Sequence, residues 1–274
     1  GFRCGTIAGR FCRFKLAGEW AVGHAKDRPI PFVRRRLSGD LMIKMLRHRF
    51  DSIPDTRRAA SVNFPLTDVL MAAYAMFCFK DASLLAFQNR FEGPNVRSIF
   101  GIRDVPSDTQ MREILDPISE EPLHEAFADL LRLVISEKDL LKFRAEDGRY
   151  YAAIDGTGYF SSERVHCDRC QEKRHKNGSV TYSHHALAMV LLHPDRTEVL
   201  PLGVEPILKQ DGNNKNDCER NAVRRLLKRV RLQHPTLPLT VIEDGVASNG
   251  PHIRDLKEAK CHFILGAKPG DHQH

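Results

Sequence analysis

Two aspartates occupy matching positions in the second half of the sequence. Asp155 and Asp244 each follow a short apolar run that reads as a buried strand, and each precedes a glycine. In open α/β sheets, groups at the carboxyl ends of strands converge in one crevice. Two carboxylates there repel each other unless a divalent cation neutralises them, and Mg²⁺ prefers such oxygen ligands. The pair therefore indicates either a Mg²⁺ (or Mn²⁺) site for phosphoryl transfer or two ordinary Asp-Gly turns.

A second group of chemistry-bearing side chains follows the first aspartate. Cys167 and Cys170 form a Cys-x-x-Cys pair, and His175 and His184 come next. Thiolates and imidazoles are the ligands of tetrahedral zinc, but the spacing after the cysteine pair matches no standard zinc finger. Free thiols with surface histidines are the alternative to a structural Zn²⁺. His184 and the histidine after it lie on a predicted strand and face opposite ways, so at most one is expected to join a site.

The elements that must position these groups begin after residue 148. Strand-like runs and amphipathic helices alternate there, and the first two long strands are separated by a His-Pro-Asp turn that predicts a hairpin. A hairpin followed by alternating helices and strands predicts a mixed sheet covered by helices. The expected order is strand 150–154, strands 182–192 and 198–204, helix 218–233, strand 239–242, helix 249–259 and strand 262–267.

The first half of the chain has a different pattern. Apolar residues recur at helical spacing from residue 38 to about 146, with no strand-like alternation. Pro65 stands at the start of one helix, and Ser107 and Gln110 have the spacing of a capping box at the start of another. An all-helical N-terminal domain is therefore predicted.

Charge and composition exclude several classes of protein. Residues 1–37 hold nine basic and two acidic side chains, which equals the whole net charge of +7, and the remaining residues are balanced. This segment is expected to be either a disordered or non-native extension or a basic arm that touches DNA. Seven scattered cysteines do not form a secreted disulfide framework, which favours a cytosolic protein. The apolar runs fall short of the roughly 18 to 20 residues that span a bilayer, so no membrane partner is expected.

Longer motifs surround the two aspartates. They are Ala153-Ile154-Asp155-Gly156-Thr157-Gly158-Tyr159-Phe160-Ser161-Ser162, Lys209-Gln210-Asp211-Gly212 with Asn216-Asp217-Cys218-Glu219-Arg220-Asn221-Ala222, and Glu243-Asp244-Gly245 with Ser248-Asn249. With these motifs the chain, from about Leu37 onward, resembles the DDE transposases of bacterial insertion sequences. The resemblance implies an RNase H-like catalytic domain in which Asp155 and Asp244 are catalytic and bind the metal. It also implies double-stranded DNA as partner, at transposon ends and target, a homodimer in a synaptic complex, and a cytoplasmic, nucleoid-associated location.

The third acid of that family is a glutamate on a late helix, after the fifth strand. Only seven residues follow the last predicted strand, so this acid is expected to be absent. Glu205 and Glu219 are present, but neither is at the expected place. The chain alone is therefore expected to be inactive, as a truncated gene, a decayed copy or half of a split frame.

Basic and polar residues in three regions are candidates for DNA contact. Three short helices between residues 82 and 115 resemble a loose helix-turn-helix, and the basic helix 218–233 and the segment before it could contact phosphates. Plain helix packing, solvated charge and intramolecular salt bridges are the alternatives. The candidates are Arg57, Arg58, Thr109, Gln110, Arg112, Lys209, Lys215, Arg220, Arg224, Arg225 and Lys228.

Three segments with different roles follow from these patterns. Residues 1–37 form the basic extension, 38–147 a helical domain that binds DNA ends, and 148–274 the incomplete RNase H-like domain. The leading hypothesis is a transposase-type recombinase that cuts and joins DNA. A non-catalytic DNA-binding remnant that occupies transposon ends, and a metal-dependent nuclease of the same fold with a rearranged acid, are the alternatives.

Overall fold

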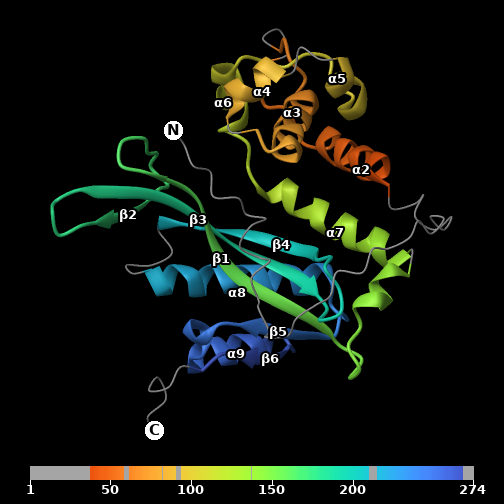
Figure 1. Ribbon diagram of the computed structural model, residues 1–274, viewed down its shortest axis with the longest axis vertical. Coiled ribbons are helices and arrows are strands. Elements are labelled where there is room, and N and C mark those ends of the chain that lie inside the picture. Colours follow the sequence, from red (N-terminus) through yellow and green to blue (C-terminus); the bar gives the residue numbers. More distant parts are fainter. Residues whose placement is uncertain are drawn as a thin grey trace, which may run out of the picture. The chain divides into compact units, whose positions relative to one another are not determined.

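The computed structural model describes most of the chain, namely residues 38–58, 62–81, 83–90, 94–136, 138–209 and 215–267. These residues fall into two compact units, 38–133 and 134–267. Figure 1 labels their helices and strands. The predicted basic extension, 1–37, lies outside the described residues.

The first unit is built from helices, as predicted. Two of their starts have the caps that their sequences favour. The Ser38 hydroxyl accepts a hydrogen bond from the Leu41 N–H, and Ser107 and Gln110 form the reciprocal capping box. The helices are α2 (Gly39–Asp51), α3 (Leu66–Phe79), α4 (Leu84–Arg90), α5 (Pro94–Phe100), α6 (Asp108–Leu115) and α7 (Glu121–Ser136), the last of which ends just inside the second unit.

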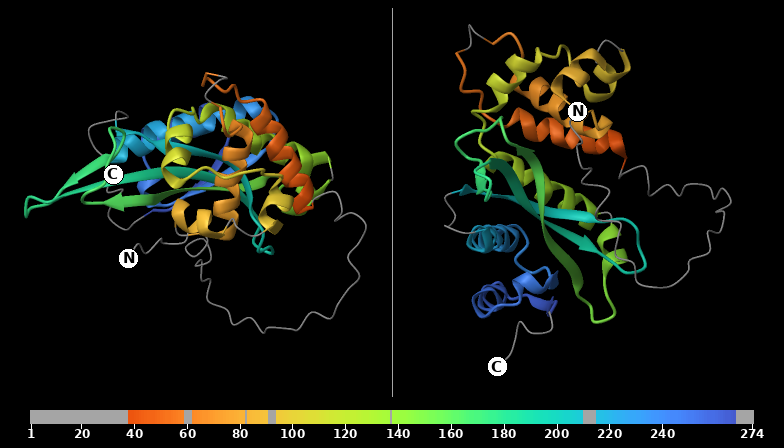
Figure 2. Two further views of the ribbon diagram at one scale, coloured as in Figure 1. Left: turned by 90° about the horizontal axis from the view of Figure 1, so that it is seen from above. Right: turned by 60° about the vertical axis from the view of Figure 1, so that its left-hand side comes forward.

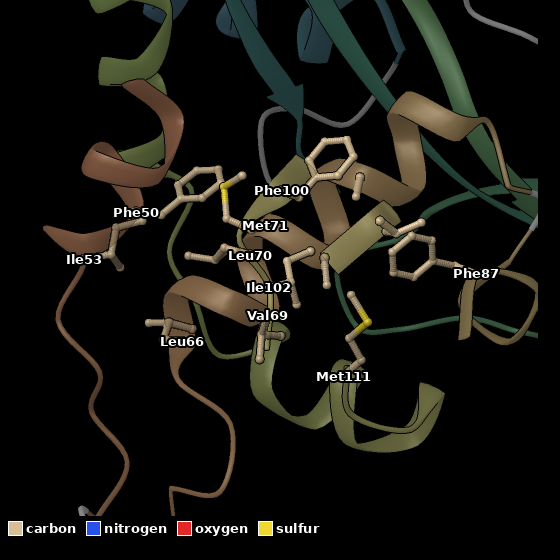
Figure 3. Packing of buried hydrophobic residues seen from close by; sticks show 13 residues of the cluster. Phe50, Ile53, Leu66, Val69, Leu70, Met71, Phe87, Phe100, Ile102 and Met111 are labelled. Atoms are coloured by element: carbon tan, nitrogen blue, oxygen red, sulfur yellow. The ribbon is translucent and has the colours of Figure 1, made fainter. Parts of the chain in front are cut away.

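Helix α3 supplies the centre of this unit's core. Val69, Met71 and Ala72 are fully buried on it, and Phe87 and Met111 reach it from α4 and α6 (Figure 3). Burying a side chain of this size stabilises a fold by about 1.5–3 kcal/mol. The apolar stripe of α3 therefore organises the shorter helices around it.

Among the described helices, none is by itself long and apolar enough to cross a membrane. Helices α3 and α4 reach that length and hydropathy only when taken together, across a bend of 93°. Half of the residues of α3 are buried in the core of its own unit.

The second unit is a six-stranded mixed sheet. Five strands lie in the order β2-β3-β1-β5-β6. The sixth, β4, pairs with residues 185–191 of β3, whereas β2 pairs with residues 180–183 of the same strand. Strand β3 is antiparallel to β1, β2 and β4, whereas β5 is parallel to both β1 and β6. The strands are β1 (Tyr150–Ser162), β2 (Gln171–Arg174), β3 (Val180–Leu192), β4 (Leu200–Ile207), β5 (Leu239–Glu243) and β6 (His262–Leu265).

Two helices connect the parallel strands and cover one face of the sheet. Helix α8 (Lys215–Gln233) leads into β5, and α9 (Gly250–Glu258) leads into β6. The right-hand view of Figure 2 shows both on the same side of the sheet. Leu226 and Val230 of α8 are buried, as its apolar stripe predicts. This arrangement confirms the predicted α/β class, a mixed sheet flanked by helices after an all-helical N-terminal region.

Strand β1 is longer than predicted. It continues to Ser162, eight residues past the predicted end at Ile154, because β3 pairs with it from Tyr151 to Ser162. Strand β2, which was expected to be loop, pairs with residues 180–183 of β3. The resulting hairpin projects from one end of the sheet (Figures 1 and 2).

Candidate functional site

The structure brings Asp155 and Asp244 to the same edge of the sheet. The parallel pairing of β1 and β5 ends at Ala153 and Ile242, which are partners. Each aspartate lies two residues beyond its partner position, Asp155 within β1 and Asp244 directly after β5. Both are exposed, and both line one pocket of about 490 Å³. The prediction that Asp155 ends a strand is wrong, because β1 continues, but the pairing to β5 does stop there.

Further acidic and polar side chains line this pocket. Glu219 and Arg220 enter from the first turns of α8, Glu243 from the end of β5, and Asn249 and His252 from the start of α9. Carboxylates at positions 155, 219, 243 and 244 therefore surround one solvent-accessible cavity. Hard divalent cations such as Mg²⁺ and Mn²⁺ bind oxygen ligands of this kind.

Glu243 and His252 form a buried pair at the wall of this pocket. The Glu243 Oε2 and His252 Nε2 atoms are 2.7 Å apart, with 5% and 2% of the two side chains exposed. Within the described part of the chain, neither His252 Nε2 nor Glu243 Oε1 has a hydrogen-bond partner. An unpartnered buried carboxylate oxygen is costly. The donor set therefore fits a cation in this pocket.

Backbone contacts hold the loop that carries Asp244. The Gly266 N–H donates to the Glu243 carbonyl at 3.0 Å, which ties the end of β6 to the end of β5. A Cβ atom on Gly266 would lie 2.9 Å from the Gly245 nitrogen and 3.3 Å from the Asp244 carbonyl carbon. Asp244 therefore depends on a glycine at position 266.

Basic residues of α8 differ in their surroundings. Arg225 donates to Glu205 at 2.5 Å, and Arg229 pairs with the other oxygen of the same buried carboxylate. Arg224 donates to Asp255 of α9 at 2.7 Å and is half exposed. Arg220 faces the acidic pocket, and Lys228 is exposed, lining a second pocket between α8 and α9.

Two of the candidate basic residues, Lys209 and Lys215, lie before and at the start of α8. The Lys209 ammonium contacts the Glu172 carboxylate at 2.6 Å, and this ion pair raises the pKa of Lys209. Lys215 is the first residue of α8.

In the first unit, three of the candidate residues for DNA contact lie on α6. Thr109, Gln110 and Arg112 are exposed there. Gln110 also belongs to the capping box, and Arg112 lies 3.8 Å from Asp108. Gly101, between α5 and α6, has a left-handed φ of 66°.

The two arginines before α3, Arg57 and Arg58, have different surroundings. Arg57 donates to both oxygens of Asp55 and to the Phe64 carbonyl, whereas Arg58 is exposed. The Arg57 guanidinium lowers the pKa of Asp55 by hydrogen bonding. Arg57 thus forms an intramolecular ion pair, one of the two roles foreseen for it.

Cys167 and Cys170 contact one of the two candidate histidines, His184. The His184 Nε2 lies 3.3 Å from both the Cys167 Sγ and the Cys170 Sγ. His175 contacts Thr181 instead, at 2.7 Å. Burial lowers the pKa of His184 and raises that of Cys170.

Sequence reasoning missed four residues of the acidic pocket. Glu219 is not at the place expected for the family's third acid, and Glu243, Asn249 and His252 are not among the candidates that the sequence predicts. Glu243 and Asn249 do occur within the quoted motifs, so the motifs held a usable signal. For His252 the only signal is its place three residues after Asn249, whose side chain accepts from the His252 N–H at 3.1 Å.

No known protein family matches the sequence, and no curated protein matches it. Solved transposase structures are similar to it. One is a piggyBac transposase synaptic complex with hairpin DNA, with a TM-score of 0.37 and 14% identity, covering 88% of this chain and 51% of that chain. A Mos1 transposase paired-end complex with the left transposon end has a TM-score of 0.27 and 10% identity, over 81% of this chain and 66% of that one.

A pre-cleavage Mos1 transpososome gives a TM-score of 0.26 and 9% identity, over 88% of this chain and 80% of that one. This chain spans about half the length of the piggyBac chain.

Proposed function

We propose that this chain carries the two metal-binding aspartates of a transposase, which cuts and joins the ends of an insertion sequence in double-stranded DNA by metal-dependent phosphoryl transfer. The observation that carries the proposal is the shared pocket of Asp155 and Asp244, which come from parallel strands at matching register. The strand order and the quoted motifs support the same conclusion.

In this proposal the two aspartates hold Mg²⁺ or Mn²⁺ through their carboxylate oxygens. A bound metal supplies charge neutralisation at the phosphate and activation of the attacking oxygen. The chain's own residues position the reactants, because phosphoryl transfer needs little covalent work from the protein. The fixed register of β1 and β5 sets the separation of the two carboxylates, and Gly266 keeps the second one in place.

In this proposal, basic residues near the pocket and exposed residues on α6 contact the DNA. Arg220 lines the pocket itself, and Lys228 and Arg224 lie further along the same helix. Such contacts supply sequence-independent affinity that falls with added salt. In this proposal the exposed Thr109 and Arg112 of α6 contact a DNA end, and a homodimer pairs two ends in a synaptic complex.

Metal binding is the most direct test. Titration with Mn²⁺, followed by calorimetry or electron paramagnetic resonance, is compared for the wild-type chain and for Asp155→Asn, Asp244→Asn and Asp195→Asn. Asp195 is 90% exposed in the β3–β4 turn and serves as the matched control. We expect the first two variants to weaken Mn²⁺ binding at least about tenfold. Equal binding by all four proteins would overturn the proposal.

Activity is measured on supercoiled plasmid and on linear duplex in the presence of Mn²⁺. If the chain nicks DNA, Asp155→Asn and Asp244→Asn should each reduce the rate by about 10²-fold or more, the scale of losing one charge-stabilising group. Asp195→Asn should leave the rate unchanged.

Glu219 favours a second candidate function, a metal-dependent nuclease of the same fold. It brings a third carboxylate into the pocket from α8, where the resemblance places none. The two functions differ in their products. A transposase joins a freed 3′ end to a second DNA molecule, whereas a nuclease only cuts. A labelled duplex incubated with plasmid distinguishes them, because joined products require strand transfer.

A further inference from the structure

We propose that Cys167, Cys170 and His184 bind a zinc ion that fastens the loop after β1 across strand β3. Within the described residues, these three form the one group of three or more potential ligand atoms that lie close enough to share an ion. The site lies in the β1–β3 hairpin region of the second unit. It does not depend on the proposed chemistry at Asp155 and Asp244.

The distances between the ligand atoms match tetrahedral zinc. Zn–S bonds of about 2.3 Å and Zn–N bonds of about 2.0–2.1 Å place two sulfur ligands about 3.8 Å apart and sulfur and nitrogen about 3.5 Å apart. Here the Cys167 and Cys170 sulfurs are 3.8 Å apart, and each lies 3.3 Å from His184 Nε2. A disulfide would require the two sulfurs to be about 2.05 Å apart.

The sheet register brings these ligands together. Gln171, the first residue of β2, pairs with Ser183 of β3, so the residue before it, Cys170, lies opposite His184. The chain crosses from the end of β1 to the other edge of β3 between Glu163 and Cys170. The two cysteines therefore join the last part of this crossing to His184, near the start of β3.

Neighbouring contacts hold the ligands in place. The Tyr159 ring stacks on the His184 ring, with centroids 5.8 Å apart and planes 13° apart, and Phe160 packs against the same imidazole. The Cys170 N–H donates to the Cys167 carbonyl, and the Cys167 N–H donates to the Cys170 sulfur. Amide donation of this kind stabilises a thiolate, the form that binds metal.

The donor set selects the metal. Two thiolates and one imidazole favour zinc over Mg²⁺ or Mn²⁺, which prefer oxygen. Three protein ligands would leave one position of a tetrahedron for water.

Metal content tests the site. Untagged protein is purified in reducing buffer, saturated with Zn²⁺, desalted and analysed for metal, and the same is done for Cys167→Ser, Cys170→Ser and His184→Asn. His175→Asn, in the same hairpin, and Cys78→Ser, in the first unit, are the controls. We expect about one zinc per chain in the wild type and both controls, and loss of at least about tenfold in affinity in the three ligand variants.

Two further measurements keep the proposal falsifiable if a variant folds poorly. X-ray absorption on the wild type should show two sulfur and two lighter ligands. Chelation of the zinc should increase tryptic cleavage at Arg169, which lies between the two cysteines, several-fold relative to cleavage at Arg196. A reduced wild-type protein that retains no zinc, or zinc retained equally by all variants, would overturn the proposal. Mn²⁺ binding at the aspartate pocket is a separate measurement, so failure of one proposal leaves the other standing.

Discussion

Asp155 and Asp244 lie the same number of residues beyond Ala153 and Ile242, a pair of partners in parallel strands. Parallel strands keep neighbouring positions level across the sheet, about 4.8 Å apart. The two carboxylates thus face one pocket although 88 residues separate them in the sequence. This relationship is the basis of the proposed metal site.

Glu219→Gln should weaken Mn²⁺ binding by about tenfold, because it removes one negative charge from the pocket that holds both aspartates. Calorimetric titration measures the change. Glu258→Gln is the control, since Glu258 lines the other pocket. An unchanged affinity in Glu219→Gln would show that α8 contributes no charge to the metal and would remove support for the nuclease alternative.

Gly266→Ala should destabilise the second unit by about 1–3 kcal/mol, the usual cost of overpacking. The added methyl group would meet the Gly245 nitrogen at 2.9 Å, so the Asp244 loop must shift. Urea denaturation gives the free energy of unfolding, and Mn²⁺ titration should show weaker binding as well. In Gly250→Ala, a Cβ would meet only Arg254, at 3.7 Å, and both measurements should stay near wild type.

Glu205→Ala should lower the free energy of unfolding by about 3–5 kcal/mol. Glu205 is buried and pairs with Arg225 and Arg229, so its removal leaves two guanidinium groups near the core without their carboxylate. Glu198→Ala, at an exposed position close by in sequence, should change stability by less than about 0.5 kcal/mol. Equal denaturation midpoints for the two variants would contradict this interpretation.

Asp55 and Arg57 predict a small pH dependence. Arg57 lowers the pKa of Asp55 in the folded chain. The pair therefore stabilises the fold above the unfolded pKa of Asp55, about 3.9, and this contribution disappears as the pH falls through the lower folded pKa. Because the pair is partly exposed, we expect about 0.5 kcal/mol or less. In an NMR titration, Arg57→Gln should return the Asp55 pKa to its ordinary value, whereas Arg58→Gln should not.

The sequence pattern predicted the strands that carry the aspartates and the helices that cover them, because the apolar periodicity of these elements is strong. It did not predict β2, whose four residues, Gln171–Arg174, are all polar and mostly exposed. Such a strand forms because it pairs with its partner strand, and its sequence shows no alternation of apolar and polar residues. The extension of β1 past Ile154 was missed for the same reason, since most of its later residues are exposed.

The sequence predicted which residue types form the candidate sites better than it predicted which residues lie together in one site. The Cys-x-x-Cys pair was evident, but the choice between His175 and His184 depends on the register of β2 against β3. Likewise, Glu219 reaches the pocket because of how α8 packs on the sheet. Tertiary packing of this kind is not encoded in local spacing.

The parallel register of β1 and β5 also constrains how this chain can vary. One inserted residue within 239–243 would reverse the sides of every later side chain in that strand and turn position 244 away from position 155. The connection 234–238, between α8 and β5, is not a strand, so a change in its length does not reverse the sides of the residues in β5. Natural variants of this protein should therefore differ in length there, and keep the five residues before the second aspartate at constant length.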